Sequence, residues 1–264
     1  MKNKIRELLN SNSMTLCTRL ANKWPYLVEM VGAFGNFDYV EYVAEYSPFS
    51  QDELENFVRA AELHNLGTMI KVDYYNSAYV AQKAIASGFQ AILFTDCHNA
   101  EDVRKAVYSV KPDTPEYKGH FGYPTRRFIH FQPFLSQQDH VERVNDVVLA
   151  FMIEKQSAMD EIEEICSIPG VDMVQFGPSD FAMSNGENLA NYRPQAQEAE
   201  KRMIETALKH NVRPRCEIYG KPSDIKEKLK LGVKDICFGD DIKTYRHFAE
   251  QIGKEAREIL LSNK

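Results

Sequence analysis

Two kinds of segment alternate along this chain. Short runs rich in β-branched and aromatic residues are separated by longer stretches whose apolar positions recur at helical spacing. The short runs lack strict apolar-polar alternation, which is typical of strands covered on both faces. Eight segments are therefore predicted to be strands: residues 14–20, 37–45, 67–73, 89–96, 147–154, 171–177, 212–219 and 234–240.

The stretches between these segments carry signals for helix boundaries. Ser50, with Glu53 three residues later, forms a capping-box pattern, and Gly88 is a candidate C-terminal glycine. Eight strand-helix units predict a (β/α)8 barrel, the TIM barrel, filling residues 1–264 as a single domain. A short helix at 3–10 would close the bottom of the barrel, and an extended helix would end the chain. The alternative is a doubly wound sheet, but no GxGxxG motif follows the first strand.

The predicted fold turns strand ends into candidate site residues, because such barrels carry their active sites at the C-terminal ends of the strands. Charged residues occur at or just after these ends: Arg19, Glu45, Lys71, Asp96, Glu154, Asp180, Glu217, Asp240 and Asp241.

Glu154 and Asp180 follow neighbouring strands, so their carboxylates can converge. Two carboxylates in a dry site repel each other unless they are protonated or bridged by a cation. Oxygen ligands suit a hard divalent ion such as Mg²⁺ or Mn²⁺. The alternative is that each acid caps the helix that follows it.

Lys71 and Glu45 also end neighbouring strands and are expected to lie within reach of each other. Lys71 is interpreted as a cation aimed at a substrate carbonyl or carboxylate and held by Glu45, as one half of a rim ion pair, or as a Schiff-base nucleophile. In "FGPSD", Gly177 ends a strand, and the backbone amides of Ser179 and Asp180 are expected to bind a carboxylate or phosphate.

Composition narrows the function further. The net charge is −6, with 32 basic and 38 acidic residues, which argues against a nucleic-acid partner. Five cysteines without a CxxC spacing predict buried thiols in a cytoplasmic protein and no zinc site. The sequence shows neither a signal-peptide pattern nor an apolar stretch of about 20 residues, so no contact with a membrane is predicted. The irregular segment 111–138 is predicted to form a lid or wall of the site.

Three stretches together resemble the HpcH/HpaI aldolase family of the phosphoenolpyruvate/pyruvate barrel superfamily. They are "FMIEKQSAM", "GVDMVQFGPSDFAMSNG" and "GFQAILFTDCHNAEDVRKAV". The resemblance extends over nearly the whole chain and implies class II aldolase chemistry. Glu154 and Asp180 fall on the family's metal-binding positions, which implies Mg²⁺, Mn²⁺ or Co²⁺ as cofactor. The ion would chelate a 2-oxo acid, and the resemblance also implies a homohexamer with helix exchange near the C-terminus.

The chain departs from the family pattern on one side of the site. Tyr46 replaces the catalytic-base histidine, while Val43 and Ser87 replace two acids, and Lys71 replaces an arginine that contacts the keto oxygen. A tyrosine is a poor base near neutral pH. A metal-bound water, a substrate oxyanion or His120 could accept the proton instead, and these alternatives remain open.

The predicted function is a divalent-metal-dependent carbon–carbon lyase that cleaves or forms a 4-hydroxy-2-oxo acid through a pyruvate enolate. The substrates would be a 2-oxo acid and an aldehyde, and the predicted catalytic residues are Lys71, Glu45 and Tyr46. Two alternatives are kept: a Schiff-base aldolase using Lys71, and a barrel that binds a 2-oxo acid without turnover.

Overall fold

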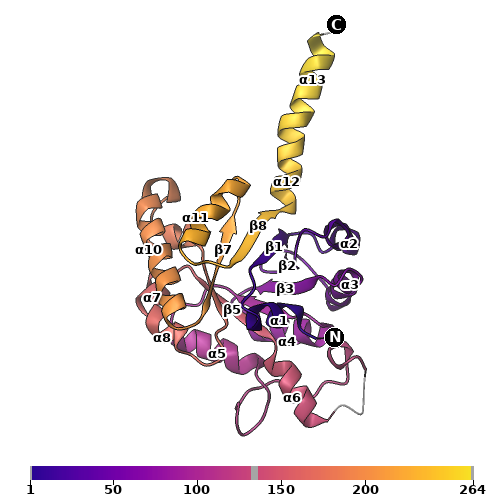
Figure 1. The fold of residues 1–264 in the computed structure, drawn as a ribbon, viewed down its shortest axis with the longest axis vertical. Coiled ribbons are helices and arrows are strands. Elements are labelled where there is room, and N and C mark those ends of the chain that lie inside the picture. The colour runs from indigo at the N-terminus through magenta and orange to yellow at the C-terminus, as the bar shows by residue number, and fades with distance from the viewer. Residues whose placement is uncertain (1, 132–135, 263–264) are drawn as a thin grey trace.

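Eight parallel strands close into a barrel in the order β1 to β8, with β8 paired to β1 (Figure 1). The structure is a computed structural model that describes residues 2–131 and 136–262. Each strand lies within a segment predicted from the sequence, so the barrel prediction is confirmed. The strands are β1 Thr15–Leu20, β2 Tyr39–Val43, β3 Gly67–Val72, β4 Ala91–Phe94, β5 Val148–Ile153, β6 Met173–Phe176, β7 Arg213–Ile218 and β8 Asp235–Asp240.

Helices alternate with the strands, and most of them cover the outside of the barrel. They are α1 Lys4–Asn10, α2 Pro25–Phe34, α3 Gln51–Glu62, α4 Ser77–Ser87, α5 Ala100–Val110, α6 Gln137–Asn145, α7 Gln156–Asp160, α8 Ile162–Cys166, α9 Pro178–Ser184, α10 Leu189–Lys209, α11 Ile225–Lys230, α12 Asp241–His247 and α13 Gly253–Ser262, with short helical turns η1 Arg127–Ile129, η2 Pro222–Asp224 and η3 Phe248–Ile252. The capping box of Ser50 and Glu53 forms as predicted, and Gly88 ends α4 in the left-handed conformation at φ 109°.

The α1 helix closes the N-terminal end of the barrel, as expected. Ile5 is fully buried and packs with inward-facing strand residues such as Tyr39 and Met69. Arg6 donates to both carboxylate oxygens of Asp172, which ties α1 to the start of β6. The N-terminal end of the barrel is therefore closed, and the active site is expected at the C-terminal end.

The C-terminal helical run leaves the barrel at the end of β8. It passes through α12, η3 and α13, and Figure 1 shows it projecting away from the other elements. Within residues 2–131 and 136–262, no helix is both long and apolar enough to cross a membrane.

The prediction that segment 111–138 covers the mouth of the barrel is wrong. This segment connects α5 to β5, and a connection from a helix back to a strand lies at the N-terminal end of a parallel barrel. The backbone N–H of His120 donates a hydrogen bond to the carbonyl of Tyr108 in α5, and its carbonyl accepts one from the side chain of Gln82 in α4. Arg126 forms an ion pair with Glu55 of α3 at 2.6 Å. His120 is therefore placed among the helices, away from the strand ends. Residues 132–135 of the segment lie outside the described residues.

Candidate active site

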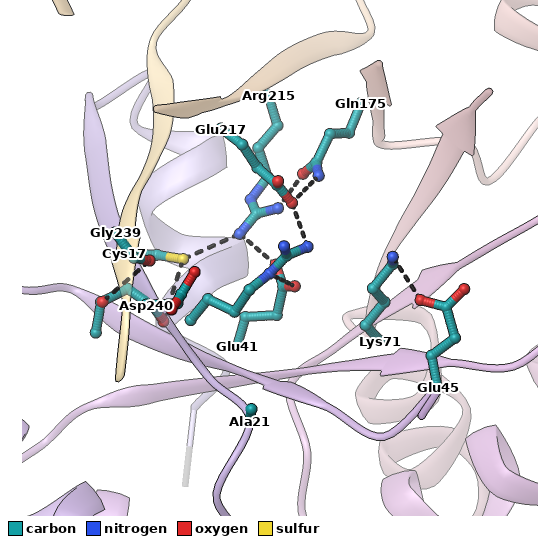
Figure 2. Close-up of polar contacts among 12 residues, drawn as sticks. Cys17, Ala21, Glu41, Glu45, Lys71, Gln175, Arg215, Glu217, Gly239 and Asp240 are labelled. Carbon is teal, nitrogen blue, oxygen red and sulfur yellow. Dashed lines mark hydrogen bonds and ion pairs between the residues drawn. The ribbon is translucent and has the colours of Figure 1, made fainter. Parts of the chain in front are cut away.

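Lys71 and Glu45 form a buried ion pair at the ends of β3 and β2. Their Nζ and Oε2 atoms are 2.5 Å apart, and the side chains are 9% and 4% exposed (Figure 2). Burial alone would lower the pKa of Lys71, but the charge and hydrogen bond of Glu45 outweigh it and raise that pKa. Lys71 is thus held as a cation. This state favours the interpretation as a charge aimed at a substrate oxygen over that of a neutral nucleophile.

Glu154 is buried directly after β5, with 2% of its surface exposed. Burial raises its pKa to about 7, and the charges of Asp180 and Asp96 add to this rise. The backbone N–H of Asp96, which donates to Oε1 at 2.8 Å, and the charge of Lys71 act in the opposite direction. Glu154 therefore shares one electrostatic environment with Asp180, Asp96 and Lys71.

Gly177 leaves the space that the Glu154 carboxylate occupies. A Cβ atom at position 177 would lie 2.5 Å from Oε2 of Glu154 and 2.9 Å from its Cβ. Any residue with a side chain would therefore push Glu154 out of place. The glycine requirement links the end of β6 to the acid that follows β5.

Asp180 lies in the first turn of α9, which begins at Pro178. The side chain is partly exposed, and its charge raises the pKa of both Glu154 and Tyr46. The N–H groups of Ser179 and Asp180 also belong to this first turn, where a helix offers them no internal partner. The elements thus bring the predicted metal ligands and the predicted carboxylate-binding amides to one end of the barrel.

The side chains at the predicted metal centre have the chemistry that a divalent cation requires. Glu154 and Asp180 offer only carboxylate oxygens, the ligand type preferred by Mg²⁺ and Mn²⁺. A buried acid with a raised pKa is also the state expected of a carboxylate that lacks its cation. The residues present therefore fit a hard divalent ion.

Tyr46 is near the site but poorly suited to accept a proton. The residue is 76% exposed, yet partial desolvation, a hydrogen bond to Glu45 and the charges of Glu45, Asp180 and Asp96 raise its pKa above the ordinary value. Deprotonation of this phenol is therefore harder than in water.

Asp96, a predicted site residue, forms an ion pair with Lys155, which was not predicted. Asp96 follows β4 in the left-handed conformation at φ 53°, and its Oδ1 lies 2.7 Å from Nζ of Lys155. This conformation presents the Asp96 amide to Glu154. The Lys155 contact was not predicted, because a lysine directly after the candidate ligand Glu154 carries no sequence signal of its own.

Asp240 and Asp241 have structural partners. Asp240 caps α12 by accepting from the N–H of Lys243 at 2.6 Å, and Asp241 accepts from the N–H groups of Ala21 and Asn22. Asp240 is therefore a helix cap, and Asp241 fixes the backbone that follows β1.

A network of buried charges fills the barrel below the strand ends, and Arg215 is at its centre. Arg215 is fully buried, and its Nη2 lies 2.6 Å from Oε2 of Glu41 (Figure 2). It also donates to Tyr39, Gln175 and Cys17.

Arg19 continues this network toward the mouth. Its Nε donates to Glu41 at 3.0 Å, and its two amino groups contact Tyr219 and Glu217. Burial opposes ionisation of Glu41, but the charges of Arg215 and Arg19 overcome it and lower the Glu41 pKa to about 2. Arg19 and Glu217 were predicted site residues, whereas Glu41 and Arg215 were not. The signal was the period-two spacing of Arg215 and Glu217, which places both side chains on one face of β7.

Cys17, Glu41 and Cys237 bring ligand atoms within 4.8 Å of one another, the one such group of three among the described residues. The guanidinium of Arg215 already occupies this position, since Nη2 lies 3.0 Å from Sγ of Cys17 and also pairs with Glu41. A cation there would face a fixed positive charge, so the group does not fit a metal centre. All five cysteines are buried and free, as predicted.

Comparison with known proteins agrees with this fold. The family model described as HpcH/HpaI aldolase/citrate lyase matches residues 51–247. The 5-keto-4-deoxy-D-glucarate aldolase of Klebsiella pneumoniae is 23% identical over 251 residues, 95% of each chain. The crystal structure of an HpcH/HpaI aldolase from Desulfitobacterium hafniense matches with a TM-score of 0.87 and 20% identity over 96% of each chain. The protein CitE from Mycobacterium tuberculosis, in complex with magnesium and acetate, matches with a TM-score of 0.55 and 11% identity over 86% of each chain. The chain belongs to the HpcH/HpaI aldolase/citrate lyase family.

Proposed function

We propose that this protein is a divalent-metal-dependent carbon–carbon lyase that cleaves or forms a 4-hydroxy-2-oxo acid. The observation that carries the proposal is the environment of Glu154. This acid is buried beside the charges of Asp180 and Lys71, and Gly177 keeps open the space it occupies. Membership of an aldolase and citrate lyase family supports the reaction class.

Glu154 and Asp180 would hold the metal ion, with Mg²⁺, Mn²⁺ or Co²⁺ as candidates. The ion would supply Lewis acidity that stabilises negative charge on the keto oxygen of a bound 2-oxo acid. The magnesium in the CitE relative supports the choice of a hard cation.

Lys71 would place a second positive charge beside the keto oxygen. Its ion pair with Glu45 fixes the ammonium group and keeps it protonated. A lysine offers a point charge where the family's arginine offers a two-pronged donor, so the orientation supplied by Glu45 becomes more important. The amides of Ser179 and Asp180 would accept the substrate carboxylate.

Neither Tyr46 nor His120 is suited to accept the proton. The raised pKa of Tyr46 argues against the residue that replaces the family's histidine, and His120 lies among the helices. A water or a substrate oxyanion is therefore the better acceptor. The name of the Klebsiella relative supports a sugar-derived 2-oxo acid as the substrate class.

Proton exchange at the methyl group of pyruvate tests the proposal. In D₂O with Mn²⁺, the wild-type protein should exchange these protons well above the background rate. Glu154→Ala and Asp180→Ala should each abolish both Mn²⁺ binding and exchange. Glu187→Ala, at an exposed acid after α9, should change neither.

Three outcomes separate the alternatives. Tight binding of pyruvate without exchange would indicate a binding protein. Borohydride trapping of pyruvate on Lys71, together with exchange that resists a chelator, would indicate a Schiff base. Unchanged Mn²⁺ affinity in both alanine variants would contradict the ligand assignment.

We also propose that the protein is a homo-oligomer. The resemblance implies a hexamer, and the projecting C-terminal run carries exposed apolar residues that an assembly would cover.

A further inference from the structure

A cavity lies at the N-terminal end of the barrel, away from the strand ends. Its volume is about 350 Å³, and it is lined by residues before β4, residues before β5, η1 and the end of α6. Figure 1 shows α6 and the amino terminus at the opposite end of the molecule from α12 and α13. The irregular segment that the sequence singled out contributes Arg127 and Phe128 to the lining.

Arg143 lines this cavity without a counterion. It has no hydrogen-bond or ion-pair partner among the residues that the structure describes, and its Nη1 atom is buried. The nearby Asp146, also in the lining, does not reach ion-pair distance of it. A partly buried guanidinium without an acceptor loses its hydration and gains nothing in return.

Arg127 lines the same cavity and is only partly satisfied. One of its amino groups contacts Glu62, the second acid of the lining. Its Nε atom is buried and has no hydrogen-bond partner within residues 2–131 and 136–262. Burial and neighbouring positive charges, among them Arg143 and Arg127, lower the pKa of His130. The lining therefore carries three cationic side chains, Lys2, Arg127 and Arg143, against the two acids Glu62 and Asp146.

Other arginines with little exposure in this chain show the contrast. Each has a carboxylate partner: Arg6 has Asp172, Arg19 has Glu41 and Glu217, Arg213 has Asp235, and Arg215 has Glu41. Each of these structural guanidinium groups therefore has a carboxylate to neutralise its charge. Arg143 and the Nε of Arg127 depart from this pattern, and both residues line one cavity.

We propose that this cavity is a binding site for a small organic anion, either a carboxylate or a phosphate monoester. The charged group would lie against Arg143 and Arg127, and the apolar part of the ligand against Phe128. The volume is within the range of small-molecule sites, about 300–1,000 Å³. Because the cavity and the strand ends lie at opposite ends of the barrel, this ligand would not compete with the substrate.

Calorimetric titration of the full-length, metal-free protein tests the proposal. Phenyl phosphate and benzoate serve as probes, and benzyl alcohol serves as the uncharged control. At least one anionic probe should bind at a concentration where benzyl alcohol gives no heat. Tighter binding of phenyl phosphate would identify a phosphate site, and tighter binding of benzoate a carboxylate site.

The variant Arg143→Gln should weaken binding by about tenfold or more, since it removes a charge-assisted hydrogen bond in a partly dry site. Arg143→Lys should restore part of the affinity. Lys201→Gln removes one positive charge from exposed α10 and should leave affinity unchanged. Without probe, Arg143→Gln should melt at the same temperature as the wild type or higher, which separates lost binding from lost folding.

Two results would overturn the proposal. One is an anionic probe that binds no better than benzyl alcohol up to about 10 mM. The other is equal affinity of wild type and Arg143→Gln, which would place the bound probe elsewhere. Neither result depends on metal or on aldolase activity.

Discussion

Glu154 illustrates how a single carboxyl group can cost stability. Its folded pKa of about 7 is raised from 4.5, mainly by burial. An acid with a raised folded pKa contributes fully below its unfolded pKa, and stability is lost as the pH rises from about 4.5 toward 7. Active-site groups commonly carry such a cost, because they are placed for function.

We therefore predict that Glu154→Gln stabilises the metal-free protein at pH 8, by up to about 3 kcal/mol, and has little effect at pH 4. Urea denaturation at the two pH values measures the difference. The amide oxygen of the variant can still accept from Asp96, so the local hydrogen bond is kept. Glu187→Gln should change neither value, and equal effects of Glu154→Gln at both pH values would contradict the assigned pKa.

The contribution of Glu41 to stability depends on pH with the opposite sign. Its pKa is lowered to about 2 by Arg215 and Arg19 against the effect of burial, so its contribution is present above pH 4.5 and is lost as the pH falls toward 2. Glu41→Gln leaves Arg215 with an uncompensated buried charge and should destabilise the protein by about 3–5 kcal/mol at pH 7.

The double variant Glu41→Gln/Arg215→Gln removes both charges, so it should lose less stability than the sum of the two single variants. A double-mutant cycle in urea measures this coupling. Additive single effects would show that the two side chains do not act as a pair.

At the scale of the elements, the strands were predictable because each is a short apolar run bounded by turns or helix caps. The placement of Lys71, Glu154 and Asp180 at one end of the barrel was predictable too, because the fold fixes where the strand ends meet. The inward-facing Glu41 and Arg215 were not recovered. The period-two spacing of Arg215 and Glu217 places both side chains on one face of β7, but one sequence does not show whether that face meets water, a helix or partners on other strands.

The misplaced segment 111–138 has a different cause. Its length and composition correctly marked it as unusual, but length does not say which end of the barrel a loop occupies. The order of elements does: a segment between α5 and β5 crosses at the N-terminal end. A segment at the N-terminal end holds His120 away from the site, and there Arg127 contacts Glu62 at the end of α3.

At the scale of the whole molecule, η3 and α13 project from the barrel, and none of their described residues is buried. Phe248, Ile252, Ala256 and Leu260 recur at a spacing of four residues, and the three larger side chains are 58%, 50% and 64% exposed. A row of apolar side chains at this spacing lies along one side of a helix. Such a surface on an isolated projection indicates contact with another chain.

We predict that a second copy of this chain covers the apolar row, and that Ile252→Glu/Leu260→Glu converts an oligomer into monomers. Two charges in an apolar interface would have to be desolvated without partners, at a cost that exceeds the contribution of either side chain to the contact. Light scattering coupled to size exclusion measures the mass. Lys254→Gln/Glu258→Gln, which alters a weak ion pair at 3.8 Å on the same helix, should keep the oligomer. A wild-type protein that runs as a monomer at micromolar concentration would contradict the assembly. An unchanged mass for the double glutamate variant would move the interface away from this helix.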